Sequence, residues 1–289
     1  MASFQLEPRE LEILRTLARL HFMTAWEIAE VFFSQECTVK ARLRRLASRG
    51  LIRRHALGVP ASFRYSAWRL SATGIKAVLD EFPDEAIAAD LDERLARKGL
   101  VHLEHRRSIS RVYLDLLRGG AGELLEDSST CTVAGWIDML RKRAAQVRWQ
   151  ADGEVVIQFE DASGRVQLVP DATVVSPAKR VRLFIELDRS NKGLSRIEEH
   201  LGRYASFLRT EYSRHYRDCL TPWVVFVVKS EGRRQGIARL MERILGRAGQ
   251  CLVGDQDATP WLSSVLLRDE DAEWMAANGY NTVDPNAAQ

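Results

Sequence analysis

Three acidic residues stand at the ends of two apolar segments in the C-terminal half of the sequence. Asp171 follows Pro170 at the end of the first segment, and Glu186 and Asp188 flank Leu187 at the end of the second. Because alternate residues of a β-strand point to the same face, Glu186 and Asp188 are expected to project together, within reach of Asp171. Converging carboxylates are typical ligands of Mg²⁺ or Mn²⁺, and such an ion can activate water and stabilise charge on a phosphodiester. The alternative is that Glu-x-Asp anchors a loop at the end of a strand.

The segments around these carboxylates predict an α/β domain. Helical spacing over 101–118 and 133–147 precedes two strands that are joined by a turn signal at 161–164. A helix follows in which Ile197, Leu201, Tyr204 and Leu208 share one face, and a second helix is expected over 237–245. The expected strands are 155–159, 165–169 with 172–175 as its extension or the start of the next strand, 182–187, 223–228, 251–253 and 262–266.

The acidic pattern resembles the PD-(D/E)xK nuclease signature, with Pro170-Asp171 and Glu186-Leu187-Asp188 as its two parts. The expected order of elements is similar to the core of that superfamily, which implies a three-layer α/β domain that cleaves DNA with a divalent ion. His200-Leu201-Gly202-Arg203-Tyr204 resembles the QxxxY helix motif of part of the superfamily, although Tyr204 also fits an ordinary core position. The metal ligands that this resemblance implies are Asp171, Glu186, Asp188 and Glu104, the last matching an extra acidic residue of some members.

The chain departs from the signature at one position. The superfamily places Lys two residues after the Glu, where it helps to polarise the scissile phosphate or the attacking water, and this chain has Asp188 there. Lys192 or Arg189 in the following loop could substitute, so the resemblance implies catalytic roles for Asp171, Glu186 and Lys192. The opposite interpretation is a domain that keeps the nuclease-like fold without cleavage and serves DNA binding, dimerisation or contact with a partner.

The N-terminal segment, residues 8–74, predicts a winged helix. Three helical patterns begin at Pro8, at the capping box Thr24-Ala25-Trp26-Glu27, and after Ser34, and Gly50 ends the third. Residues 52–57 and 63–70 then predict two strands around a turn at 58–60. In the third helix the residues Val39, Leu43 and Leu46 share the inward face, whereas Lys40 and Arg44 lie on the opposite side.

The basic side chains of this segment indicate double-stranded DNA as the partner. In winged helices the third helix enters the major groove and its first residues read base edges, while other cations hold phosphates. The alternatives are a solvated charged helix face and a module that binds another protein. The candidate residues are Gln35, Thr38 and Lys40 for bases, Arg53, Arg54 and Arg64 for phosphates, and Arg42, Arg44 and Arg45 on the same helix.

Composition agrees with a DNA-binding protein, and the sequence argues against a membrane-spanning protein, a secreted protein, a P-loop NTPase and a GxSxG hydrolase. The content of 46% hydrophobic and 28% charged residues is that of an ordinary globular protein. Residues 1–80 hold 13 Lys/Arg against 7 Asp/Glu, which gives this segment a net charge of +6, whereas the whole chain has a formal net charge of +3. The positive field therefore belongs to the N-terminal segment. No apolar run is long enough to span a bilayer, no signal peptide is expected, and no P-loop or GxSxG motif is present. The four cysteines are far apart and form no CxxC pair, which favours reduced cytoplasmic thiols over a disulfide or zinc framework.

The sequence therefore predicts an α+β protein with a winged helix over 1–80, an acidic linker over 81–100, a nuclease-like α/β domain over 101–275 and a flexible tail over 276–289. The whole pattern over about 6–230 resembles the bacterial plasmid replication-relaxation family. That resemblance implies a plasmid- or nucleoid-associated protein that regulates or assists replication, and the cysteine spacing and the lack of a long apolar run favour a cytoplasmic protein with no membrane association. It also implies protein partners from a mobile element and a homodimer as interpretations to test, and a metal-dependent endonuclease as the alternative function.

Overall fold

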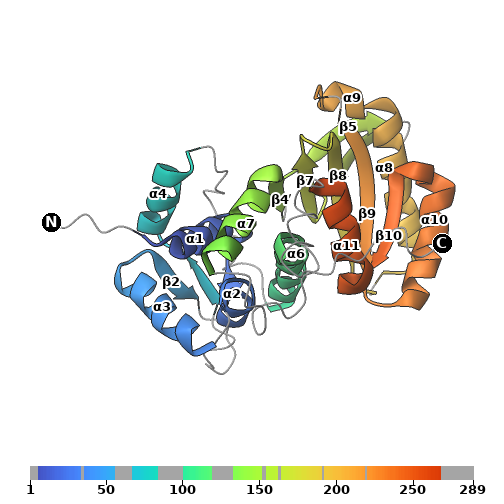
Figure 1. The fold of residues 1–289 in the computed structure, drawn as a ribbon. Coiled ribbons are helices and arrows are strands. Elements are labelled where there is room, and N and C mark those ends of the chain that lie inside the picture. The colour runs from blue at the N-terminus through green and yellow to red at the C-terminus, as the bar shows by residue number, and fades with distance from the viewer. Residues whose placement is uncertain are drawn as a thin grey trace. The chain divides into compact units, whose positions relative to one another are not determined.

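The structure is a computed structural model in which residues 6–33, 36–55, 67–83, 100–118, 133–151, 154–161, 164–190, 192–218 and 220–267 are described. The chain forms two units (Figure 1). The first comprises Met1–Ser110 and Gly122–Lys142, and the second comprises Arg111–Ala121 and Arg143–Gln289. Two helices, α6 (Leu100–Arg118) and α7 (Val133–Gln146), contribute residues to both units.

The first unit has three helices followed by two strands, in the order that the sequence predicts. Its elements are α1 (Pro8–Leu20), β1 (Met23–Thr24), α2 (Ala25–Phe32), α3 (Glu36–Ser48), β2 (Ile52–His55), β3 (Ala67–Leu70) and α4 (Ala72–Glu81). The three strands form an antiparallel sheet in the order β1-β3-β2. The predicted capping box is present, because the Thr24 hydroxyl accepts from the Glu27 N–H and the Glu27 carboxylate accepts from the Thr24 N–H.

Apolar spacing explains why these helices pack together. Val39, Leu43 and Leu46 of α3 have no exposed surface, and neither has Leu14 of α1 or Ile28 of α2. Burial of such aliphatic side chains stabilises a fold by roughly 1.5–3 kcal/mol each. The predicted inward face of the third helix is therefore the face that α3 buries.

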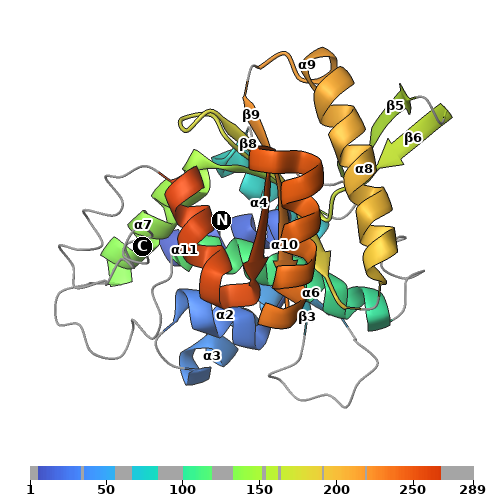
Figure 2. The ribbon, with the colours of Figure 1, turned by 90° about the vertical axis from the view of Figure 1, so that its right-hand side faces the viewer.

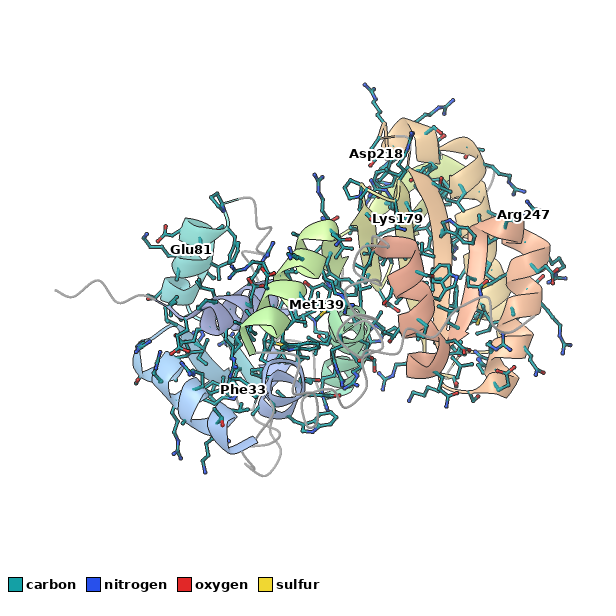
Figure 3. The ribbon with its side chains drawn as sticks, viewed as in Figure 1. Phe33, Glu81, Met139, Lys179, Asp218 and Arg247 are labelled. Atoms are coloured by element: carbon teal, nitrogen blue, oxygen red, sulfur yellow. The ribbon has the colours of Figure 1, made fainter. Side chains whose placement is uncertain are left out.

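The first unit also includes residues from far along the chain. The Trp136 indole of α7 donates to the Val31 carbonyl at 2.7 Å, and Arg141 Nε is 2.8 Å from a carboxylate oxygen of the buried Glu12. Met139 of α7 and Phe33 at the end of α2 are both buried (Figure 3). Helix α7 thus contributes apolar packing and hydrogen bonds to the first unit.

The second unit contains a five-stranded sheet in the order β10-β9-β8-β7-β4. The strands β8, β9 and β10 are parallel, whereas β7 and β4 run antiparallel to their neighbours. A separate antiparallel pair, β5 with β6, completes the strands. Their bounds are β4 (Arg148–Ala151), β5 (Ile157–Asp161), β6 (Gly164–Leu168), β7 (Ala172–Ser176), β8 (Val181–Asp188), β9 (Thr221–Val228) and β10 (Gly249–Val253).

Helices cover both faces of this sheet, which gives three layers. The helices α8 (Leu194–Thr210) and α10 (Glu231–Leu245) lie side by side on one face, with the β5–β6 pair beside α8 (Figure 2). Phe184, Tyr204 and Met241 are central residues of the core between this face and the helices. On the other face Trp223 of β9 contacts Trp261 of α11 (Gly254–Leu266), with 5.9 Å between ring centroids. Two short helices, α9 (Tyr212–His215) and η2 (Gly246–Ala248), connect the larger elements.

These observations confirm the mixed α/β class, and they correct one predicted element. Residues 262–266, expected as a strand, form the end of helix α11. A short apolar run does not distinguish a strand from a buried helix turn. The buried residues Ala258, Leu262 and Leu266 recur every four positions, which is the helical spacing.

Several expectations lie outside the described residues or remain untested. The turn at 58–60, most of the predicted linker 81–100 and the tail 276–289 are not described, so the predicted domain boundaries stay predictions. In the part of the chain that the structure describes, no helix is long and apolar enough to cross a membrane.

Gly74 provides a test of the packing of α4 against Leu51 within the first unit. A Cβ atom at Gly74 would lie 2.0 Å from the Leu51 carbonyl oxygen, so Gly74→Ala forces the backbone apart and should destabilise the protein by about 1–3 kcal/mol. Gly202→Ala is the matched control. A Cβ atom at Gly202 in α8 would have no atom outside its own helix turn within 4 Å, so this substitution should be stabilising by up to about 1 kcal/mol. Thermal unfolding of both variants measures the difference, and a stable Gly74→Ala protein would contradict this packing.

Candidate functional site

Helix α3 presents two cations to solvent. Lys40 and Arg44 are exposed, and they lie on the side of the helix opposite to the buried Val39 and Leu43. Thr38 is also exposed near the start of the helix, whereas Gln35 lies outside the described residues. Three of the residues that the sequence assigns to DNA are therefore exposed on α3.

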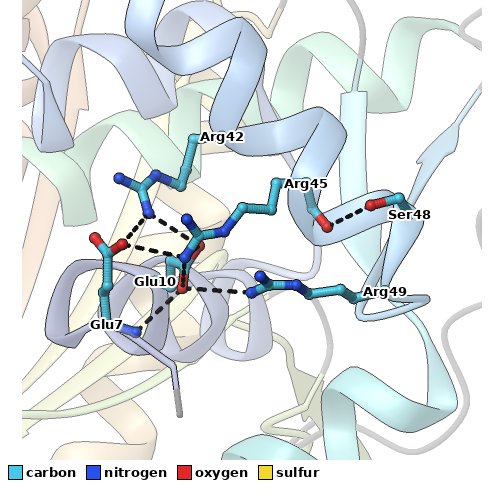
Figure 4. A network of polar contacts seen from close by, with 6 residues as sticks. All are labelled: Glu7, Glu10, Arg42, Arg45, Ser48 and Arg49. Atoms are coloured by element: carbon cyan, nitrogen blue, oxygen red, sulfur yellow. Dashed lines mark hydrogen bonds and ion pairs between the residues drawn. The ribbon is translucent and has the colours of Figure 1, made fainter. Parts of the chain in front are cut away.

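Two further arginines of α3 are engaged within the unit. Arg42 Nη1 lies 2.6 Å from Glu7 Oε1 and 3.2 Å from Glu10 Oε1, and Arg45 Nη2 lies 3.0 Å from Glu10 Oε1 (Figure 4). Arg49 Nη1 approaches the same carboxylate, at 3.9 Å from Glu10 Oε2. The Glu10 carboxylate has no exposed surface, so these arginines supply the positive charge that its burial requires.

The ionisation of this network follows from its hydrogen bonds. The hydrogen bond from Arg42 lowers the pKa of Glu7, and the hydrogen bond to Glu7 raises the pKa of Arg42. Both groups are thereby held in their charged forms, and α3 is fixed against the N-terminal end of α1. Arg42 and Arg45 thus hold α3 to the N-terminal end of α1, while Lys40 and Arg44 are exposed.

Strand β2 carries the described part of the predicted wing. Arg53 and Arg54 are both exposed, and they are paired in register with Arg69 and Trp68 of β3. Because they are consecutive strand residues, they point to opposite faces of the small sheet. Arg64, the third predicted wing residue, lies outside the described residues.

In the second unit, the predicted carboxylates gather at one edge of the five-stranded sheet, the edge where β8 ends and β7 begins. Glu186 and Asp188 end β8, and both face the layer of α8 and α10, since Glu186 contacts α8 and Asp188 contacts α10. Asp171 immediately precedes β7, whose first residue Ala172 pairs with Ile185, so the register places Asp171 beside Glu186. The Asp171 Oδ2 atom accepts from the Leu187 N–H at 2.7 Å. The structure therefore brings together the three acidic residues singled out in the sequence.

Glu186 is held by the helix motif that resembles QxxxY. Its Oε1 atom accepts from the Tyr204 hydroxyl at 2.7 Å and lies 3.0 Å from His200 Nε2. Glu186 is buried and Tyr204 is fully buried, so this contact lies away from water. Burial together with the nearby carboxylates of Glu186 and Asp171 raises the pKa of Tyr204 well above its usual value, which keeps the hydroxyl protonated as a donor.

Asp188 is held by a residue that the sequence reasoning missed. Arg233 of α10 forms a bidentate ion pair with Asp188, with Nε 2.5 Å from Oδ2 and Nη2 3.1 Å from Oδ1. The same Nη2 atom donates to the Lys192 carbonyl at 2.6 Å. A signal was present in the sequence, because Arg233 follows the apolar strand next to β8 and parallel strands end at the same edge of a sheet.

The other two predicted site residues are less engaged. Lys192 has an exposed side chain in the loop between β8 and α8, and its carbonyl rather than its ammonium meets Arg233. Glu104 lies in α6, and its side chain is outside the described residues. Neither observation places a catalytic lysine or a fourth carboxylate at the cluster.

The donor set does not fit a divalent ion in this arrangement. Both Asp188 oxygens meet Arg233, one Glu186 oxygen meets Tyr204 and His200, and one Asp171 oxygen meets a backbone N–H. Among the described residues, no group of three or more His, Cys, Asp or Glu side chains has the geometry to hold a metal. An ion at Asp188 would have to displace the guanidinium.

Comparison with known proteins gives one match. A family model described as replication-relaxation matches residues 14–222. No curated protein and no solved structure matches the chain. The matched region extends from α1 to the start of β9, so it includes the three carboxylates, His200 and Tyr204, and it ends before Arg233.

The contact between Tyr204 and Glu186 predicts an unequal effect of two hydroxyl deletions. Tyr204→Phe removes a hydrogen bond to a buried carboxylate and should lower the free energy of unfolding by about 1.5–3 kcal/mol. Tyr216→Phe is the control, since Phe keeps the ring that faces the Arg182 guanidinium, whose Cζ lies 3.7 Å from the ring centroid, so the free energy of unfolding should change by less than about 0.5 kcal/mol. Denaturant unfolding of the two variants gives the comparison, and equal decreases would contradict a specific contribution of the Tyr204 hydroxyl.

Proposed function

The chain belongs to the replication-relaxation family, and on this premise we propose that it is a double-stranded DNA-binding protein that regulates or assists replication of a plasmid or other mobile element. In this proposal the first unit is a winged helix that finds the DNA. The second unit is a nuclease-like domain that binds DNA or partners without cutting. The protein acts in the cytoplasm on plasmid or nucleoid DNA.

The observation that carries the proposal is the division of charge on α3. Its buried side packs on the core, its inner arginines are matched by Glu7 and Glu10, and Lys40 and Arg44 are exposed on the outer side. A helix that is fixed to the domain along one side and cationic along the other can enter a major groove without losing its packing. Two exposed arginines on β2 would then lie on the same small domain to meet phosphates.

The ion pairs on the inner side of α3 also support specific rather than loose binding. A recognition helix reads bases only if its side chains are held in a fixed position against the groove. The Glu10 network joins the last two turns of α3 to α1, so it resists rotation of the helix about its own axis. Thr38 and Lys40, at the other end of α3, are the residues that we expect to touch bases.

For the second unit we favour binding over cleavage. The position that the nuclease signature gives to a lysine holds Asp188, and that carboxylate is already paired with Arg233. Dimerisation and contact with a protein of a mobile element are the roles that we propose to test for this unit.

The double variant Lys40→Ala/Arg44→Ala tests DNA binding by α3. It should weaken duplex binding, and the slope of log K against log salt should shrink by about 0.9 for each phosphate that the protein no longer neutralises. Fluorescence anisotropy with a labelled duplex at several salt concentrations measures both quantities.

The matched control is Lys76→Ala/Lys142→Ala, which removes two exposed cations of the first unit, from α4 and α7, and leaves α3 intact. Its affinity and salt slope should equal those of the parent protein. A folded Lys40→Ala/Arg44→Ala protein with unchanged affinity and slope would reject α3 as the DNA-binding surface.

A metal-dependent endonuclease is the second candidate, because Asp171 and Glu186 lie beside each other at the sheet edge as the signature requires. Incubation of supercoiled plasmid with Mg²⁺ or Mn²⁺ tests it. We expect the parent protein and Asp171→Ala to leave the plasmid equally intact. Nicking by the parent that Asp171→Ala abolishes would instead establish the nuclease, and would leave DNA binding by the first unit as a separate question.

A further inference from the structure

The carboxylate cluster at the edge of the large sheet places three negative groups close together with little access to water. Glu186 and Asp188 are 7% and 5% exposed, two positions apart on one strand, and Asp171 lies on the neighbouring strand at the same edge. Carboxylates gathered away from water repel one another and lose their hydration. In metal-dependent sites a divalent ion removes this cost, because it supplies two positive charges to the oxygens.

In this protein the described positive charge nearest to Asp188 is a guanidinium. Arg233 approaches both Asp188 oxygens with two of its nitrogens, and its side chain is 17% exposed against 1% for that of Asp188. Paired hydrogen bonds of this kind between arginine and a carboxylate are among the strongest in proteins. The hydrogen bond to Asp188 raises the pKa of Arg233, so the cation is permanent.

Arg233 also fixes the loop in which a substitute catalytic lysine was expected. Its Nη2 atom donates to the Lys192 carbonyl, which ties the loop between β8 and α8 to α10. Val228 at the end of β9 pairs in register with Asp188, and α10 starts three residues later. The first turn of α10 therefore projects its side chains over the end of β8, where Asp188 lies.

We propose that Arg233 is a built-in counter-cation that takes the place of a divalent ion at Asp171, Glu186 and Asp188. The folded protein then needs no metal at this edge, and removal of the guanidinium opens a site for Mn²⁺ on the released Asp188 and its acidic neighbours. Mn²⁺ and Mg²⁺ are the ions suited to such an oxygen-rich set. This inference does not depend on DNA binding by the first unit, since it concerns metal binding and stability alone.

Arg233→Ala in the full-length chain tests the proposal, with Arg234→Ala as the matched control. Arg234 is the adjacent arginine of the same helix turn, but it pairs with Glu231 and not with the cluster. The unbound Mn²⁺ signal in electron paramagnetic resonance gives the affinity, and thermal unfolding in EDTA and in excess Mn²⁺ gives the stability. We expect Arg233→Ala to bind Mn²⁺ at least about tenfold more tightly than the parent and Arg234→Ala proteins.

The thermal measurement should agree with the binding measurement. Mn²⁺ should raise the unfolding temperature of Arg233→Ala and leave those of the parent and Arg234→Ala unchanged, because only a ligand of the folded state stabilises it. Asp188→Asn in the Arg233→Ala background should remove the increase. The proposal is overturned if the parent binds Mn²⁺ as tightly as Arg233→Ala, or if folded Arg233→Ala shows no increase in affinity.

A failure of Arg233→Ala to fold also gives a result. If it folds with Mn²⁺ and not with EDTA, the ion has replaced the guanidinium, as proposed. If it folds in neither, the double variant Asp188→Asn/Arg233→Gln decides, because it removes the negative and the positive charge together. Recovery of folding then supports charge compensation, whereas continued unfolding means that Arg233 acts through packing and overturns the proposal.

Discussion

A carboxylate removed from water must receive positive charge or hydrogen-bond donors from its surroundings, and this constraint organises both units of the protein. In the first unit Glu10 has no exposed surface, and arginines from α3 surround it. In the second unit Glu186 receives Tyr204 and His200, and Asp188 receives Arg233. In each case the donors come from a different helix, so each acidic residue fixes the position of one element against another. The same groups that satisfy a buried charge thus determine where the exposed cations of α3 and the edge of the large sheet are placed.

The residues that the sequence placed correctly are those whose position follows from a local period. The three-to-four-residue spacing of Val39, Leu43 and Leu46 predicted the buried face of α3, and the two-residue spacing of Glu186 and Asp188 predicted their common face on β8. The five-residue motif from His200 to Tyr204 likewise placed both side chains on one turn of α8, where they meet Glu186.

The partners of the charged residues could not be obtained in this way. Arg42 and Glu10 are 32 positions apart, and Asp188 and Arg233 are 45 apart, so no period in the sequence connects them. A cation that is exposed on a helix and one that faces a buried carboxylate look alike in a sequence, so the sequence does not separate Arg42 and Arg45 from Lys40 and Arg44. The pairing depends on which helices meet, and that is a property of the folded chain. Helix α11 was missed for a related reason, since a short apolar run has the same composition in a strand and in a buried helix.

The residues of α7 that belong to the first unit are synthesised long after its N-terminal elements, and this delay affects the order in which the chain folds. The N-terminal helices and strands end at Glu81, yet the Val31 carbonyl is satisfied by Trp136 and the buried carboxylate of Glu12 by Arg141. A growing chain that stops short of α7 therefore has the N-terminal helices and strands with two buried polar groups still lacking these partners. The elements that carry the exposed cations Lys40 and Arg44 therefore reach their full set of interactions only after about half of the protein has been synthesised.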